Sequence, residues 1–145
     1  MADTDDPREK KKRWQKFMYG YNTTMCLSLG PPMVLAPDFT RKVLNWPYND
    51  PVMTGIYGSI VTSVGILSAA ALADESKREK FLPLFYTQIM YKTATCALIA
   101  KKLRKKEVSS WGLHLYLWFF VVYIIFLAKA IPWKTVEAGE AEGSG

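Results

Sequence analysis

One apolar run near the end of the chain limits the folds that this sequence can adopt. Residues 111–128 contain no Asp, Glu, Lys or Arg, and Leu, Phe, Val, Ile, Trp and Tyr fill nearly every position. A helix needs about 20 mostly apolar residues to cross a bilayer core that is roughly 30 Å thick. The run is apolar on all sides, whereas a surface helix of a water-soluble domain keeps a polar face. It is therefore predicted to cross a membrane.

Three earlier segments resemble membrane spans in length and composition, although the first is more polar than the others. The sequence predicts an all-α, four-helix transmembrane bundle over residues 14–134, with spans at about 14–36, 51–73, 81–100 and 110–132. Residues 1–13 are a tail of acidic and basic residues, and residues 135–145 are expected to be a disordered acidic tail. Residues 37–50 are expected to be an interfacial loop, because Trp46 and Tyr48 suit the headgroup level.

The distribution of Lys and Arg leaves a second topology open. With four spans, the side that holds both termini carries slightly more of these residues, which favours cytoplasmic termini in a bacterial inner membrane. The charge difference becomes larger if residues 14–36 form a re-entrant or interfacial segment and only three helices cross. Pro31 and Pro32 would kink or end a helix there. We favour four spans, because a re-entrant backbone must be satisfied by other parts of the protein.

The positive charge of the chain is better explained by lipid than by nucleic acid. The net charge is +6, but the basic residues lie between apolar runs, where they flank spans and meet anionic headgroups. Aromatic and basic residues are not interleaved as in RNA-binding motifs. Cys26 and Cys96 fall inside apolar stretches with no metal-binding spacing, so no metal site is predicted. No nucleotide-binding loop or set of catalytic residues can be found either.

The residue that stands out chemically is Lys92, near the middle of the third span. It lies about 15 Å from either end of that helix, where an ammonium group is costly. Gln88 lies one turn away and Tyr91 is adjacent, so a polar stripe is expected to face the bundle interior. None of the four spans contains Asp or Glu. Lys92 could be a structural peg bonded to Tyr and Asn side chains, could meet a ligand or lipid, or could pair with an acid of another chain.

Two further polar residues are candidates for contacts inside the membrane. Asn22, in the first span, needs a hydrogen-bond partner from another helix. His114, the only histidine, follows Ser110 by one helical turn. This small-xxx-His spacing is similar to that of light-harvesting polypeptides, which ligate a chlorophyll-type pigment. A pigment or haem at His114 is a minor possibility beside a histidine that bonds a headgroup or the backbone, and no cofactor is predicted.

Small residues in the second span predict close helix packing. Residues four apart, such as Ser59 with Ser63, let helix backbones approach in lipid. The residues expected to pack in this way are Gly55, Gly58, Ser59, Ser63, Gly65 and Ala69.

The order of segments resembles the DoxX-like group of small four-helix membrane proteins. The likeness lies in an apolar run ending in LAPDF (residues 35–39), a glycine-rich second span GIYGSIVTSVGILS (residues 55–68), a short charged turn and two more spans. It implies a four-helix membrane fold, and it implies for some members a role as a membrane subunit beside redox enzymes. It supplies no catalytic residue.

Three functions are compatible with these features. The first is a non-enzymatic accessory or structural subunit of a larger membrane complex, redox or photosynthetic, with other membrane subunits or further copies of itself as partners. The second is a binder of a small molecule, lipid or pigment in the bundle core through Lys92, Gln88 and Tyr91, with His114 as a lesser candidate. The third is a small membrane enzyme or permease, for which Lys92 is the one candidate group.

Overall fold

The structure is a computed structural model, and it describes residues 6–108 and 110–133. The tail expected over residues 135–145 lies outside this part. The described chain is all α, without strands. Two helices, Pro51–Ala73 and Trp111–Ala130, are long and apolar enough to cross a membrane. The elements in order are α1 (Pro7–Leu35), α2 (Pro37–Val43), α3 (Pro51–Ala73), η1 (Glu75–Phe81), α4 (Pro83–Arg104) and α5 (Trp111–Ala130).

Local capping explains where the first and third helices begin. α1 starts at Pro7, ahead of the expected span, because the Asp6 side chain accepts a hydrogen bond from the Arg8 amide and Pro7 suits a first turn. Most of the basic N-terminal segment is thus helical. α3 has the bounds predicted for the second span, and Asp50 caps it by accepting a hydrogen bond from the Met53 amide at 3.0 Å.

Two other segments differ from the sequence-based expectation. α1 continues through Pro31 and Pro32 and ends at Leu35. The segment expected to be a loop contains the short helix α2, which begins at Pro37 and ends at Val43. Two prolines in succession remove donors from only two positions, and Pro37 starts a new helix where an amide donor is not needed.

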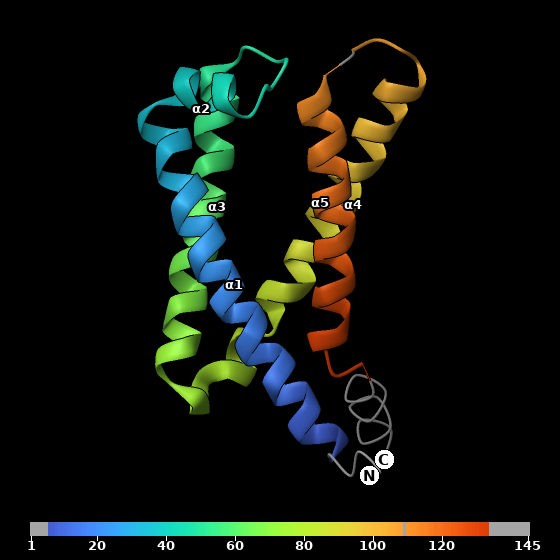
Figure 1. Cartoon of the computed structure of the whole chain (residues 1–145). Helices are drawn as coiled ribbons and strands as arrows, with labels where there is room; N and C mark the ends of the chain where they lie inside the picture. The colour runs from blue at the N-terminus through green and yellow to red at the C-terminus, as the bar shows by residue number, and fades with distance from the viewer. Residues whose placement is uncertain (1–5, 109, 134–145) are drawn as a thin grey trace, which may run out of the picture.

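The helices form two hairpins that are joined at one end of the molecule (Figure 1). α1 packs along α3 to make the first hairpin, and α4 runs beside α5 to make the second. The N-terminal part of α1 extends past this hairpin and contacts the C-terminal end of α5. There Lys11 Nζ and Gln15 Nε2 donate to the carbonyl oxygens of Ile131 and Ala130. The start of α1 and the end of α5 are therefore at the same end of the fold.

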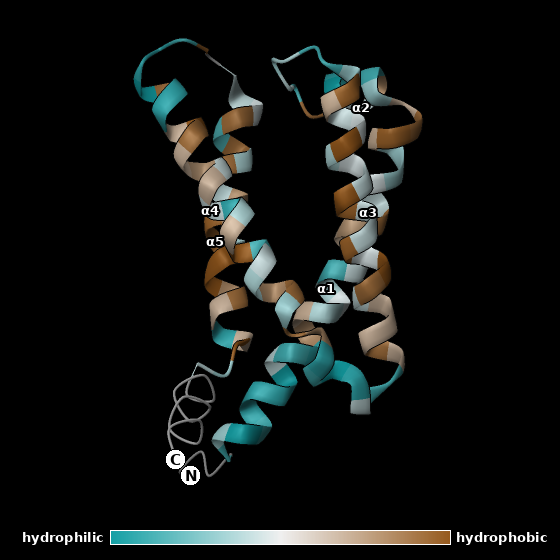
Figure 2. Cartoon of the chain, turned by 180° about the vertical axis from the view of Figure 1, so that it is seen from behind, coloured by the Kyte–Doolittle hydropathy of each residue, from teal (hydrophilic) through white to brown (hydrophobic). Residues whose placement is uncertain are grey.

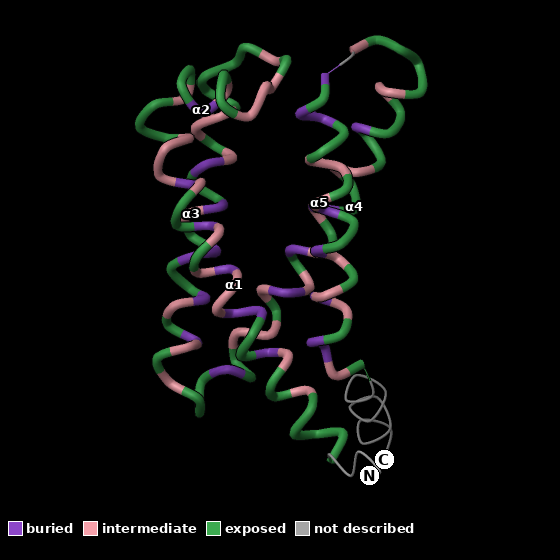
Figure 3. The backbone as a smooth tube through the Cα atoms, viewed as in Figure 1, coloured by how far each residue is buried: buried purple, intermediate pink, exposed green. Residues whose placement is uncertain are grey.

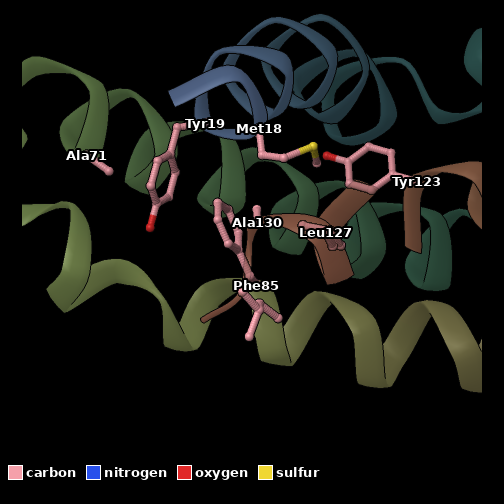
Figure 4. Close-up of a cluster of buried hydrophobic side chains, with 8 residues drawn as sticks. Met18, Tyr19, Ala71, Phe85, Tyr123, Leu127 and Ala130 are labelled. Atoms are coloured by element: carbon pink, nitrogen blue, oxygen red, sulfur yellow. The ribbon is translucent and has the colours of Figure 1, made fainter. Parts of the chain in front are cut away.

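The main core lies where the two hairpins meet. Tyr19 and Phe85 are fully buried, and their ring centroids are 4.5 Å apart. The Tyr19 hydroxyl donates to the Arg78 carbonyl oxygen at 2.9 Å, which ties α1 to η1. The buried members of this cluster are Met18, Tyr19, Ala71, Phe85, Tyr123, Leu127, Ala130 and Ile131 (Figure 4).

Polar and apolar residues are arranged in zones along the molecule. Hydrophilic residues gather at the start of α1 and in η1 at one end, and around the connections at the other end (Figure 2). Buried and exposed residues alternate along every long helix, so each has a face that packs inside and a face that does not (Figure 3). Many exposed residues of α3 and α5 are large and apolar, such as Ile56, Ile60 and Trp118.

Candidate functional site

The candidate site is a cavity between the two hairpins, which we call the inter-hairpin cavity. It consists of a lower hollow of about 380 Å³ that Lys92 lines and an upper hollow of about 220 Å³ beside α2. Four residues line both hollows, so the two adjoin: Met33, Leu44, Tyr57 and Tyr116. Side chains from α1, α3, α4 and α5 all contribute to the lower hollow.

Lys92 lies in the wall of the lower hollow with only 4% of its surface exposed. It faces the interior, as the polar stripe on this helix led us to expect. Its ammonium group donates a hydrogen bond to the Tyr91 hydroxyl at 2.7 Å. Among the described residues, no carboxylate forms an ion pair with it.

Aromatic rings surround this ammonium group in place of a carboxylate. Lys92 Nζ lies 4.6 Å from the ring centroids of Tyr91 and Phe120 and 4.3 Å from that of Tyr123. Each ring offers the negative face of its quadrupole, and such contacts contribute about 2 kcal/mol when desolvated. The rings partly offset the cost of a buried cation, but they supply no net negative charge.

Asn22 is connected to Lys92 through Tyr123. The Asn22 amide oxygen accepts a hydrogen bond from the Tyr123 hydroxyl, so α1 provides the partner of a residue on α5. Asn22 is fully buried and does not line either hollow. Its amide nitrogen has no hydrogen-bond partner in the described part of the chain. Asn22 therefore positions the aromatic surroundings of Lys92 rather than facing the cavity.

Gln88 is a predicted contact for a ligand or a partner, and it lies outside the lining of the cavity. It is fully buried one turn before Lys92, but it lines neither hollow. Neither polar atom of its side chain has a partner within residues 6–108 and 110–133. Tyr91, by contrast, lines the lower hollow together with Lys92.

His114 is not brought together with Lys92. It is exposed on α5 and lines neither hollow. Its Nδ1 donates to the Ser110 carbonyl oxygen at 2.9 Å, one turn earlier in the chain. This is the backbone-bonded arrangement that the sequence had left open beside pigment ligation.

The end of the cavity near α2 is held by contacts between the start of α5 and the segment after α2. The Ser110 hydroxyl donates to the Asn45 carbonyl oxygen at 2.7 Å. Gly112 approaches the backbone of Leu44 and Asn45 so closely that a Cβ would collide with it. Trp46 packs edge-on against Tyr116, with 5.2 Å between the ring centroids. The segment expected to be a loop at the headgroup level therefore contributes to the cavity wall.

The sequence did not identify most of the aromatic residues of this site. Tyr116, Phe120 and Tyr123 follow one another at spacings of four and three residues, which places them on one face of α5. That periodicity could have indicated an aromatic face opposite Lys92, but it is hidden in a run that is aromatic at many other positions. Tyr57 lies among the small residues of α3 and carried no signal of its own.

The small residues of α3 divide between two faces. Gly58 and Gly65 are buried against α1, next to Met33 and Leu27. Gly55 has open space around it, Ser59 and Ser63 are exposed, and Ala69 is half-buried. Close packing by this helix therefore takes place partly within the chain.

The arrangement supplies hydrogen-bond donors to a mostly apolar space. The polar groups of Lys92, Tyr91, Tyr57 and Tyr116 meet it, while the other residues that line the lower hollow are largely aliphatic or aromatic. The described residues include no group of three or more metal-ligating side chains. Comparison of the chain with protein-family models, curated proteins and solved structures gave no significant match. The resemblance to the DoxX-like group stays a prediction.

Proposed function

We propose that this chain is a four-span integral membrane protein that binds an amphipathic small molecule in the inter-hairpin cavity. The observation that carries the proposal is the position of Lys92. A buried ammonium group lines a mostly apolar cavity and has no carboxylate partner among the described residues. Ionisable groups at membrane depth are costly, and they commonly mark binding sites or transport pathways.

Helix length and burial support four spans rather than two. At about 1.5 Å of rise per residue, the 29 residues of α1 extend roughly 43 Å and the 22 residues of α4 roughly 33 Å. Asn22, Gln88 and Lys92 lower the hydropathy of these two helices, but all three are buried inside the protein. In this topology both termini lie on one side, which we assign to the cytoplasm of a bacterial inner membrane.

The test is extraction of the protein with its native contents. The chain is purified from membranes in a mild detergent, and bound small molecules are released into organic solvent and identified by mass spectrometry. We expect an amphiphile in near-stoichiometric amount, and its loss from Lys92→Met. Lys129→Met is the matched control, because Lys129 is an exposed lysine on α5 that lies over the Trp14 ring and lines neither hollow. Equal amphiphile content in all three samples would contradict the proposal.

A role as an accessory subunit is the second candidate, and the outer face of α3 favours it. Ser59 and Ser63 are exposed, and the half-buried Gly55 continues their row at four-residue spacing. The two serine hydroxyls bond to the carbonyl oxygens of Gly55 and Ser59, so the row is smooth and its polar groups are satisfied. Such a surface permits close approach of another membrane helix. Ser59→Leu should then release partners that co-purify with the wild-type chain, without changing the amphiphile content.

A further inference from the structure

The chemical class of the cavity's ligand follows from the charge and the donors that surround Lys92. The three aromatic rings stabilise the cation, but they leave its charge uncompensated. An unpaired ammonium at mid-depth in a bilayer costs several kcal/mol, and an anion in direct contact removes much of that cost. A neutral carbonyl oxygen would accept a hydrogen bond from Lys92 Nζ but would leave the charge as it is.

The free donors beside Lys92 match a carboxylate. The ammonium group has three N–H donors, and the Tyr91 hydroxyl accepts one of them. That hydroxyl keeps its own proton, which makes no hydrogen bond to another side chain or carbonyl oxygen of the described residues. Lys92 and Tyr91 both line the lower hollow. One carboxylate oxygen can therefore accept from Lys92 Nζ while the other accepts from the Tyr91 hydroxyl.

The rest of the lower hollow suits a single apolar chain. Met25, Leu29, Met33 and Leu115 line it, together with aromatic rings. A volume of about 380 Å³ is near the small end of the range for ligand pockets. This favours one hydrocarbon chain over the two of a phospholipid. One buried cation also matches a monoanion better than a phosphate that carries more charge.

We propose that the inter-hairpin cavity binds a long-chain carboxylate, with its carboxylate on Lys92 Nζ and the Tyr91 hydroxyl and its chain along α1 and α5. This inference rests on the proposed function, since it specifies the ligand of the same cavity. It differs from the general proposal in requiring the negative charge of the head group.

The experiment measures binding of ¹⁴C-labelled dodecanoate to the full chain in maltoside detergent by a scintillation proximity assay. Unlabelled dodecanoate and methyl dodecanoate are the competitors, because they share a chain and differ in charge. We expect saturable binding that dodecanoate displaces at least tenfold better than the ester does. Lys92→Met should weaken binding at least tenfold, whereas Lys129→Met should stay within twofold of wild type.

A second variant keeps the test decisive if Lys92→Met fails to fold. Leu29→Trp fills part of the lower hollow from a half-buried position and leaves Lys92 and Tyr91 in place. It should reduce dodecanoate binding while the thermal unfolding temperature stays close to wild type. Tyr91→Phe should weaken binding of dodecanoate more than that of the ester, because a charged carboxylate accepts a stronger hydrogen bond from the hydroxyl than a neutral ester carbonyl does.

The outcomes separate this inference from the proposed function. If the ester competes as well as dodecanoate and Lys92→Met binds normally, the ligand is not a carboxylate, although an amphiphile can still occupy the cavity. If dodecanoate shows no saturable binding, the inference is wrong, and the extraction experiment decides the proposed function independently. If the amphiphile recovered by extraction is neutral, the carboxylate inference is wrong, whereas the proposed function is supported.

Discussion

The hydroxyl groups of Tyr57 on α3 and Tyr116 on α5 are hydrogen-bonded to each other across the inter-hairpin cavity. Both residues line the lower and the upper hollow, so the bond stands where the two adjoin. Each tyrosine belongs to a different hairpin. The bond therefore links two units that otherwise meet mainly through α1 and the residues near Trp46.

Removal of both of these hydroxyls is expected to cost no more stability than removal of one. Tyr116→Phe leaves the Tyr57 hydroxyl without its partner in a mostly apolar space, which costs about 1–3 kcal/mol of stability. In the double variant with Tyr57→Phe, neither hydroxyl remains unpaired, so the loss should not exceed that of the single variants. Unfolding in increasing proportions of SDS would measure this double-mutant cycle. Strictly additive losses would show that the bond does not link the hairpins.

Two glycines of α3 should respond oppositely to the same substitution. A Cβ at Gly58 would lie 2.6 Å from Met33 Cβ and 2.9 Å from the Gly30 carbonyl oxygen, so Gly58→Ala must push α1 away. Overpacking of this kind costs about 1–3 kcal/mol. Gly55→Ala is the control, because no atom lies within 4 Å of its Cβ position. It should be neutral or stabilise the helix by up to about 1 kcal/mol. Equal effects in SDS unfolding would contradict the α1–α3 packing.

Gln15 should stabilise the end of α5. Its Nε2 donates to the Ala130 carbonyl oxygen at 3.3 Å, and the last carbonyls of a helix have no partner within it. Gln15→Leu should cost about 1 kcal/mol and speed hydrogen exchange of the amides in residues 127–131. Lys12→Met is the control, because Lys12 is exposed and its partner among the described residues is Glu9, with 3.4 Å between Lys12 Nζ and Glu9 Oε1. Unchanged exchange in Gln15→Leu would show that α1 does not hold this helix end.

The connection between α3 and η1 should make the stability of the fold depend on pH in the acidic range. Hydrogen bonds from Ser76, and then from Lys77, lower the pKa of Asp74 from 3.8 to about 2. Because the carboxyl binds its proton less tightly in the folded chain, its contribution is present above pH 4 and is lost as the pH falls from about 4 towards 2. Asp74→Asn should make the unfolding temperature depend less on pH between about 4 and 2, and Ser76→Ala should reduce this pH dependence in part. Parallel curves for wild type and Asp74→Asn would contradict this assignment.

The sequence predicted helix bounds well where they depend on residues of that helix alone. Pro51 and Asp50 fix the start of α3 through local capping, and the bounds of α5 follow from its apolar run within two residues. The start of α1 at Pro7 was missed, because the charged segment was interpreted as a tail although Asp6 and Pro7 form a capping signal. α2 was missed because a seven-residue helix is too short for a periodic pattern.

The candidate site could be predicted only in part, because it depends on how the hairpins meet. Lys92 stood out as a cation at mid-depth, and the absence of Asp and Glu from the spans is visible in the sequence. That rings from α5 replace the missing carboxylate is a tertiary feature, since Phe120 and Tyr123 lie about 30 residues further along the chain. The same holds for Asn22, whose partner Tyr123 could not be chosen among the many tyrosines.

The proposed four-span topology predicts which connections lie on the same side of the membrane. The start of α1, the segment η1 and the end of α5 lie at one end of the fold, while α2 and the connection after α4 lie at the other (Figure 1). With Cys26 and Cys96 replaced by serine, single cysteines at Ser76 and Lys105 should react with a membrane-impermeant maleimide from opposite sides. In inverted vesicles Ser76→Cys should be labelled and Lys105→Cys protected, if the termini are cytoplasmic. Labelling of both cysteines from the same side would contradict this topology, because it would mean that α4, the long helix between residues 76 and 105, does not cross the membrane. A re-entrant α1 is tested by a third cysteine near its start, at the exposed Lys10. Lys10→Cys should be labelled from the same side as Ser76→Cys if α1 crosses, and from the same side as Lys105→Cys if α1 returns, because α3 and α4 cross in both topologies.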